Sequence, residues 1–146
     1  MGFASLSQNK KGNRLNMSLR IPSLLFVLMT FFACNNVQSQ TGDVFAAKVF
    51  YKKIQATPSA IVLDVRTPEE YQSGHLPDAI NIDWNGEGFE KQVSTLDKSK
   101  PVFVYCHSGR RSTAAANQMR KNGFSKVYEL EGGIVGWNEA GLPVSK

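Results

Sequence analysis

Short apolar runs alternate along the chain with segments that mix apolar and polar positions. Two runs, 61–65 and 101–105, are almost wholly apolar, which predicts strands buried on both faces of a sheet. Shorter strands are predicted over 79–82 and 126–130. Helices are predicted over 43–55, from Thr67 onward, and over 89–96, 112–122 and 134–140. This alternation favours a three-layer α/β domain whose mainly parallel sheet has about five strands.

Capping signals mark the ends of several predicted helices. Asp43 is the N-cap candidate of the first helix, and Thr67 has Glu70 at the capping-box position. Gly123 is the expected C-cap of the helix before it. Ligands of parallel sheets bind beyond the carboxyl ends of the strands. The residues that follow the 101–105 strand are therefore candidates for a functional site.

The first part of the chain has a different pattern. Residues 1–34 contain four basic residues and no acidic residue, and an apolar run extends from Ile21 to Ala33. A helix that spans a bilayer needs about 20 apolar residues. A basic segment before a shorter apolar run is typical of an export signal. We expect residues 1–34 to be a signal peptide, with translation starting at Met1 or Met17, and the protein to act outside the cytoplasm.

Cys34 directly follows Phe32-Ala33, an arrangement that resembles the lipobox of bacterial lipoproteins, with Phe31 where leucine is usual. The resemblance implies that Cys34 is acylated and becomes the mature N-terminus. Contact with a membrane is then through that lipid alone, and 35–42 is a polar tether to the domain 43–146. The alternative is ordinary signal cleavage after Cys34, which leaves a periplasmic protein.

The net charge of +5 comes mostly from the expected signal peptide. Residues 35–146 carry 13 basic and 12 acidic side chains, so this part of the chain is almost neutral. We therefore expect no nucleic-acid partner. The length of 146 residues suits one domain.

Only two cysteines are present, Cys34 and Cys106. If Cys34 is acylated or removed, one free thiol remains in an oxidising compartment, and a disulfide scaffold is excluded. A free thiol in such a compartment indicates a catalytic role for Cys106 more than a role in core packing. His75 and His107 are the only histidines and form no ligand cluster with other residues. We expect no metal and no other cofactor.

The segment 106–111 joins the apolar strand 101–105 to the helix 112–122. Only the thiolate form of cysteine is a good nucleophile. The pKa of a thiol is lowered by inward-turned backbone N–H groups, by a helix N-terminus and by nearby arginines, and this segment offers all three. The same groups bind anions. We expect Cys106 to be the nucleophile. The binding site for a small anion is expected at His107, Ser108, Gly109, Arg110 and Arg111.

The chain from about 44 to 143 resembles the single-domain rhodanese family. The resemblance rests on five blocks in the family's order and spacing: Leu63-Asp64-Val65-Arg66, Pro68-Glu69-Glu70-Tyr71, Gly74-His75-Leu76 with Ala79-Ile80-Asn81-Ile82, Tyr105 through Ser112, and Gly132-Gly133 with Trp137. Exported bacterial members are the most similar group.

The resemblance implies a thiosulfate sulfurtransferase. Sulfane sulfur moves from a small anionic donor, through a Cys106 persulfide, to a thiol or cyanide. At the position of His107, several members of the family have Arg or Lys instead. The loop also lacks the sequence typical of members that use mercaptopyruvate, so the resemblance does not favour that donor. We expect a monomer.

A cysteine in an anion-binding loop also occurs in proteins with two other functions. In phosphatases and arsenate reductases, five residues lie between the catalytic cysteine and the arginine of the loop. Only four lie between Cys106 and Arg111, so the loop is one residue too short for that class of enzyme. A non-enzymatic persulfide carrier or binding module for a partner protein is compatible with the same residues and stays open.

Four polar or aromatic residues outside the loop have expected structural roles. Asp64 caps nearby backbone, and Arg66 pairs with Glu69 or Glu70. His75 fixes its turn by hydrogen bonding, and Trp137 anchors the last helix by packing.

Overall fold

The computed structural model describes residues 1–2 and 43–146. Most of the expected signal peptide, Cys34 and the expected tether 35–42 therefore lie outside the described residues. Among the residues that are described, no helix combines the length and apolar character needed to cross a bilayer.

Two buried strands, β2 (Ile61–Asp64) and β4 (Val102–Tyr105), pair in parallel at the centre of the sheet. The sheet has five strands in the order β1-β5-β4-β2-β3, and every pair is parallel. The edge strands are β1 (Val44–Phe45) and β3 (Ala79–Asn81), and β5 (Val127–Leu130) lies between β1 and β4. The predicted mainly parallel sheet is confirmed.

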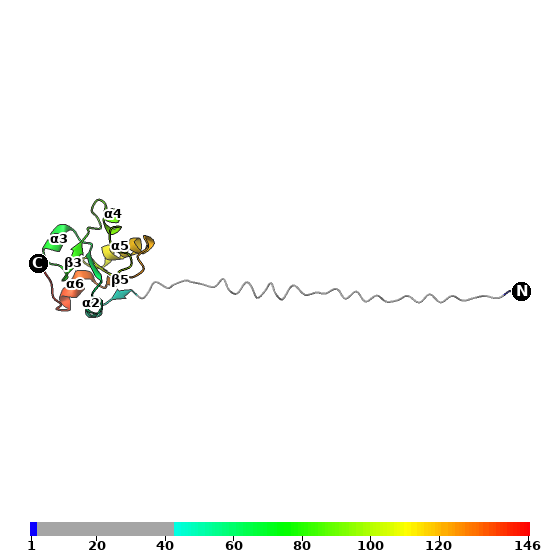
Figure 1. Cartoon of the computed structure of the whole chain (residues 1–146). Helices are drawn as coiled ribbons and strands as arrows, with labels where there is room; N and C mark the ends of the chain where they lie inside the picture. Colours follow the sequence, from blue (N-terminus) through cyan, green and yellow to red (C-terminus); the bar gives the residue numbers. More distant parts are fainter. Residues whose placement is uncertain (3–42) are drawn as a thin grey trace. The chain divides into compact units, whose positions relative to one another are not determined.

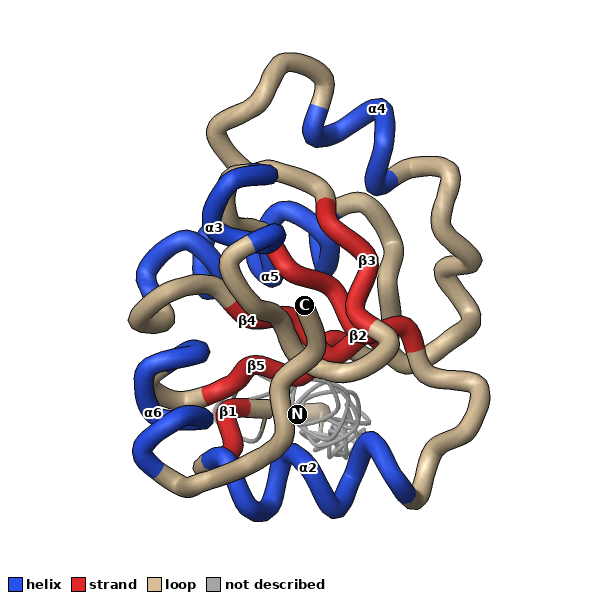
Figure 2. Tube along the Cα trace, turned by 90° about the vertical axis from the view of Figure 1, so that its left-hand side faces the viewer, coloured by secondary structure: helices blue, strands red, loops and turns tan. Residues whose placement is uncertain are grey.

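Helices cover both faces of this sheet. They are α2 (Ala47–Gln55), α3 (Pro68–Gln72), α4 (Phe89–Val93), α5 (Arg110–Lys121) and α6 (Gly133–Glu139) (Figure 1). Successive residues of β4 point to opposite faces. Phe103 and Tyr105 pack with α2 and α6, whereas Val102 and Val104 pack with α4 and α5. The three layers are visible in Figure 2, where α2 and α5 lie on opposite sides of the strands.

The first helix begins later than predicted, and Asp43 is not its N-cap. The cap is Ala46, because Val44–Phe45 form an edge strand beside β5. The Asp43 carbonyl accepts a hydrogen bond from the Glu129 N–H at 2.6 Å, and its carboxylate lies 3.6 Å from Arg120. A strand of two residues leaves no periodic pattern, so this long-range pairing could not be predicted from the sequence.

Two local predictions are confirmed. Thr67 and Glu70 form the capping box of α3: Thr67 Oγ1 accepts from the Glu70 N–H at 3.3 Å, and Glu70 Oε2 accepts from the Thr67 N–H at 3.0 Å. Trp137 is completely buried and donates its Nε1–H to the Pro143 carbonyl at 2.9 Å, as expected of a packing anchor.

The register places the ends of β2 and β4 together. Asp64 is aligned with Tyr105, so the segments that follow both strands start at the same edge of the sheet. The segment after β2 leads into α3, and the segment after β4 leads into α5. This edge is where a parallel sheet binds its ligands.

Candidate active site

Cys106 is the first residue after β4. It is only 1% exposed, and its Sγ accepts a hydrogen bond from the Gly109 N–H at 3.1 Å. Gly109 has a φ of 107°, which a residue with a side chain rarely adopts and which turns this N–H toward the sulfur. The expected inward-turned backbone is therefore present in the loop.

Ser112 supplies the second contact with the thiol, from its Oγ at 3.5 Å. Burial on its own raises the pKa of Cys106. The Ser112 hydroxyl and the backbone N–H groups of Ser112, Gly109 and Ser108 outweigh burial, and the pKa is lowered. The Gly109 carbonyl, 2.8 Å from the same hydroxyl, is the alternative acceptor for its single proton, so Ser112 binds either the thiol or the loop backbone. The site favours a thiolate, the form of cysteine that attacks.

The start of α6 holds the first residues of this loop in place. The Ile134 N–H donates to the Cys106 carbonyl at 2.9 Å, and the Val135 N–H donates to the His107 carbonyl at 3.2 Å. Gly133 has a φ of 58°, and a Cβ on it would lie 2.5 Å from both carbonyl oxygens. The predicted Gly-Gly turn is therefore also the place where two backbone segments touch.

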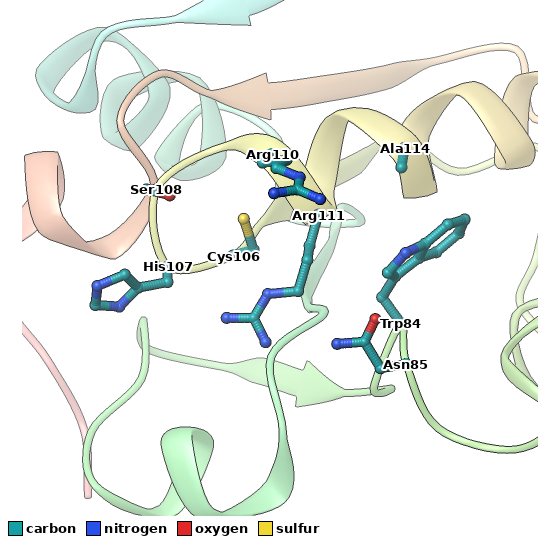
Figure 3. Close-up of a pocket in the computed structure, with 8 residues that line it drawn as sticks. All are labelled: Trp84, Asn85, Cys106, His107, Ser108, Arg110, Arg111 and Ala114. Carbon is teal, nitrogen blue, oxygen red and sulfur yellow. The ribbon is translucent and has the colours of Figure 1, made fainter.

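A pocket of about 490 Å³ opens above this loop (Figure 3). Five of the six predicted site residues line it, and the sixth, Gly109, contributes the N–H that contacts the thiol. Trp84, Asn85 and Ala114 complete the wall. Trp84 packs edge-on against Phe89 with ring centroids 4.8 Å apart. The pocket is therefore lined by two arginines beside the loop and is partly aromatic on the other side.

Arg111 is held by Glu70 in a two-pronged ion pair. Its Nη1 and Nη2 donate to Oε2 and Oε1 of Glu70, both at 2.7 Å. The hydrogen bond from Arg111 is the main reason why the pKa of Glu70 falls to about 2. The pair joins α5 to α3, two helices that the sequence alone did not connect.

The predicted partner of Arg66 is wrong. Arg66 pairs with the buried Asp64, with Nη2 and Oδ2 2.6 Å apart, and also donates to the Gly74 carbonyl at 2.7 Å. Glu70 is not its partner because Glu70 binds Arg111. The expected backbone cap by Asp64 is present, since Oδ1 accepts from the Arg66 N–H at 2.9 Å.

His75 fixes its turn as expected. Its Nδ1 lies 3.1 Å from the Tyr71 carbonyl, and its ring stacks on the ring of Tyr71. The His75 backbone also exchanges two hydrogen bonds with Ser145. These contacts give His75 a structural role in its turn.

His107 lies on the rim between two cavities. It lines the pocket above Cys106, and it also lines a neighbouring cavity of about 340 Å³. The other residues of that cavity include Glu70, Asn138 and Val144. Glu70 and Arg111 thus form a boundary, because each lines a different cavity while the two are paired.

Several residues of the site were not predicted to belong to it from the sequence. They are Ser112, which contacts the thiol, Glu70, which binds Arg111, Gly133, which allows the close approach of α6, and Trp84 and Asn85, which line the wall. For Ser112 a signal was present, because a hydroxyl in the first turn of the helix after the loop faces back toward the loop. The other four depend on contacts between distant segments.

Comparison with known proteins agrees with this geometry. A putative sulfur carrier protein of Bacillus subtilis, YrkF, is 39% identical over 90 residues, which are 62% of this chain and 48% of that protein. A sulfurtransferase of Allochromatium vinosum is 32% identical over 93 residues, which are 64% of this chain and 85% of that protein. The chain thus spans about half the length of the first relative and most of the second.

The fold has matching solved structures. The crystal structure of a rhodanese-related protein from Thermoplasma volcanium aligns with a TM-score of 0.63 and 32% identity, over 70% of this chain and 97% of that one. Residues 46–140 match the rhodanese-like domain family, and this range includes β2 through α6 and the whole loop from Cys106 to Arg111. The chain therefore belongs to the rhodanese-like family, whose members include sulfurtransferases.

Proposed function

We propose that this protein is a sulfurtransferase in which Cys106 carries sulfane sulfur as a persulfide. The observation that supports this most strongly is the position of the thiol. It lies at the floor of a pocket lined by two arginines, and its Sγ contacts the Gly109 N–H and the Ser112 hydroxyl. These contacts favour a thiolate, and the arginines attract an anionic donor.

In the first step the Cys106 thiolate attacks the outer sulfur of the donor. With thiosulfate, the simplest donor of this type, the new bond joins Sγ to the outer sulfur, and the bond between the two sulfur atoms of thiosulfate breaks. The electron pair of that bond leaves with sulfite. No proton is needed, because thiolate and thiosulfate give persulfide anion and sulfite with the same total charge. This is covalent catalysis in two half-reactions.

In the second step an acceptor thiolate, or cyanide, attacks the outer sulfur of the persulfide. The bond between Sγ and the outer sulfur breaks, and Cys106 returns to its thiolate form. The outer sulfur extends about 2 Å beyond Sγ, the length of a sulfur–sulfur bond. It is therefore more accessible to the acceptor than Sγ of Cys106, a residue that is 1% exposed.

The first test is intact-mass analysis after incubation with thiosulfate. We expect the wild-type protein to gain the mass of one sulfur atom and Cys106→Ser to gain none. No adduct on the wild type, or an equal adduct on the variant, would contradict the mechanism. Cys106→Ser is a close control because it keeps the size and the loop contacts of the side chain.

A persulfide carrier for a partner protein is the second candidate, and one observation favours it: a relative with 39% identity is a putative sulfur carrier protein. The two candidates differ in turnover. An enzyme forms thiocyanate from thiosulfate and cyanide over many cycles, whereas a carrier loads once and releases its sulfur only to a protein thiol. Single loading without multiple turnover would favour the carrier.

A further inference from the structure

Two arginines line the pocket, but their surroundings differ. Both terminal nitrogens of Arg111 donate to the Glu70 carboxylate, so its planar fork is already occupied by an anion. Within residues 43–146, no ion pair involves Arg110. Both arginines belong to the predicted anion-binding loop, and the structure gives an ion-pair partner to Arg111.

The Glu70 side of the pair is fixed independently of Arg111. Glu70 Oε2 also accepts the hydrogen bond from the Thr67 N–H that closes the capping box of α3. The carboxylate is therefore anchored on one side by the start of a helix and on the other by Arg111. Two short charged hydrogen bonds and one backbone contact make this pair a stable part of the wall.

Figure 3 shows the direction of the two side chains. The Cys106 thiol points into the curve of the loop, and Arg110 lies on that side of it. The Arg111 side chain runs the other way, and its guanidinium ends on the side away from the sulfur. Glu70 raises the pKa of Arg111 most and binds both of its terminal nitrogens, but Cys106 also contributes to that raised pKa, so Arg111 lies near enough to interact with the thiolate. Arg110 is the pocket arginine whose guanidinium has no ion-pair partner within residues 43–146 and can bind an incoming anion.

We propose that Glu70 is a specificity-determining residue of the sulfur-transfer site: by occupying Arg111 it leaves Arg110 as the cation that meets the donor, and it disfavours dianionic donors relative to monoanionic ones. The proposal rests on the sulfur transfer proposed above. The charges of Arg110 and Arg111 are offset by those of Glu70 and the Cys106 thiolate, and Asp83 adds a negative charge near Arg111, so the site has no excess positive charge before a donor enters. Such a site gains less from the second charge of a dianion than a site with a free second arginine.

Two donors of nearly equal shape test this charge preference. Thiosulfate is a dianion, and methanethiosulfonate is a monoanion in which a methyl group replaces one oxygen. Attack of the Cys106 thiolate on the outer sulfur of methanethiosulfonate breaks its sulfur–sulfur bond and releases methanesulfinate with the electron pair. Both reactions leave the same Cys106 persulfide, and the different reactivities of the two leaving groups are the same for every variant, so a change in the ratio of the two kcat/KM values between variants reports on how the protein treats the donor.

The informative variant is Glu70→Gln, because glutamine keeps the shape and the capping-box hydrogen bond but removes the charge. We expect the ratio of kcat/KM for thiosulfate to kcat/KM for methanethiosulfonate to rise about fivefold. Glu69→Gln is the matched control, since it removes the same charge from the neighbouring position of α3 without touching Arg111. Its ratio should stay within about twofold of the wild type.

A double variant keeps the test valid if Glu70→Gln alone fails to fold. Glu70→Gln with Arg111→Gln removes the whole pair without changing the net charge, and we expect the wild-type ratio to persist. Arg110→Gln should lower the ratio. Equal shifts in Glu70→Gln and Glu69→Gln, or a large fall in the double variant, would overturn the role of Glu70. Absence of a Cys106 persulfide with either donor in the wild type would refute the sulfur transfer itself, and that result is seen before any variant is compared.

Discussion

The backbone of Gly133 lies against the carbonyl oxygen of Cys106, so close that a Cβ at Gly133 would be 2.5 Å from that oxygen. The contact joins the start of α6 to the start of the active-site loop, and the Ile134 N–H reinforces it by donating to the same carbonyl. The orientation of the nucleophile therefore depends on a turn that lies 27 residues farther along the chain.

This contact predicts a strong effect of a single methyl group. Gly133→Ala should destabilise the fold by about 3 kcal/mol, because it adds a clash with two carbonyls to the strain of a positive φ. Gly132→Ala is the control: its φ of 69° is similarly strained, but its nearest non-neighbouring atom is 3.6 Å away, so about 1 kcal/mol is expected. Urea denaturation measures both. Equal losses would show that the close approach is unimportant.

The hydroxyl of Ser112 should control the ionisation of the nucleophile. The Ser112 hydroxyl lies 3.5 Å from Sγ and lowers the pKa of Cys106, so its removal in Ser112→Ala should raise that pKa. The pH dependence of alkylation by iodoacetamide measures this value. Ser108→Ala, which removes a hydroxyl of the same loop that makes no recorded contact with the sulfur, should leave the midpoint in place. The role of Ser112 fails if the two variants give the same midpoint.

The ion pair between Glu70 and Arg111 predicts a pH-dependent contribution to stability. The pKa of Glu70 is lowered from 4.5 to about 2, so the stabilisation is fully present above pH 4.5 and is lost as the pH falls toward 2. The pair is partly exposed, and we expect it to contribute about 1 kcal/mol. The difference in unfolding free energy between wild type and Glu70→Gln should therefore shrink between pH 5 and pH 2.5, and a constant difference would contradict the assignment.

The N-terminal segment supports a proposal about attachment. We propose that Cys34 is acylated after export, on the basis of the basic segment and the apolar run that precede it. The full chain expressed in a bacterium with a radiolabelled fatty acid should incorporate label, and Cys34→Ser should not. Label on Cys34→Ser, or none on the wild type, would favour ordinary signal cleavage. Cys106→Ser is the control for labelling at the other cysteine.

Much of the fold could be predicted because its signals are local. The β2 and β4 runs are almost wholly apolar since both strands are covered on two faces, and the capping box at Thr67 is set by neighbouring residues. The edge strand Val44–Phe45 could not be predicted, because it is defined only by pairing with β5. For a segment so short, tertiary contacts override the helical pattern that follows it.

The candidate site also has a part that could be predicted from the sequence and a part that could not. Cys106 and the loop after it were identified from one continuous segment, and the structure places that segment at the carboxyl edge of the sheet. The partner of Arg111 was missed because Glu70 lies 41 residues earlier, and Arg66 offered a nearer partner for it. Arg66 instead pairs with Asp64, which is buried beside it at the end of β2. Burial and helix packing decide which charged side chains form ion pairs, and the spacing of these residues along the sequence does not reveal them.

The most direct test of sulfur transfer through Cys106 follows the individual sulfur atoms. Two preparations of thiosulfate carry radioactive sulfur, one in the outer position and one in the inner position. We expect the outer label to remain on wild-type protein after gel filtration, to be absent from Cys106→Ser, and to be released when a thiol acceptor is added. The inner label should leave as sulfite. Retention of the inner label, or an outer label that does not transfer to the acceptor, would contradict a persulfide intermediate on Cys106.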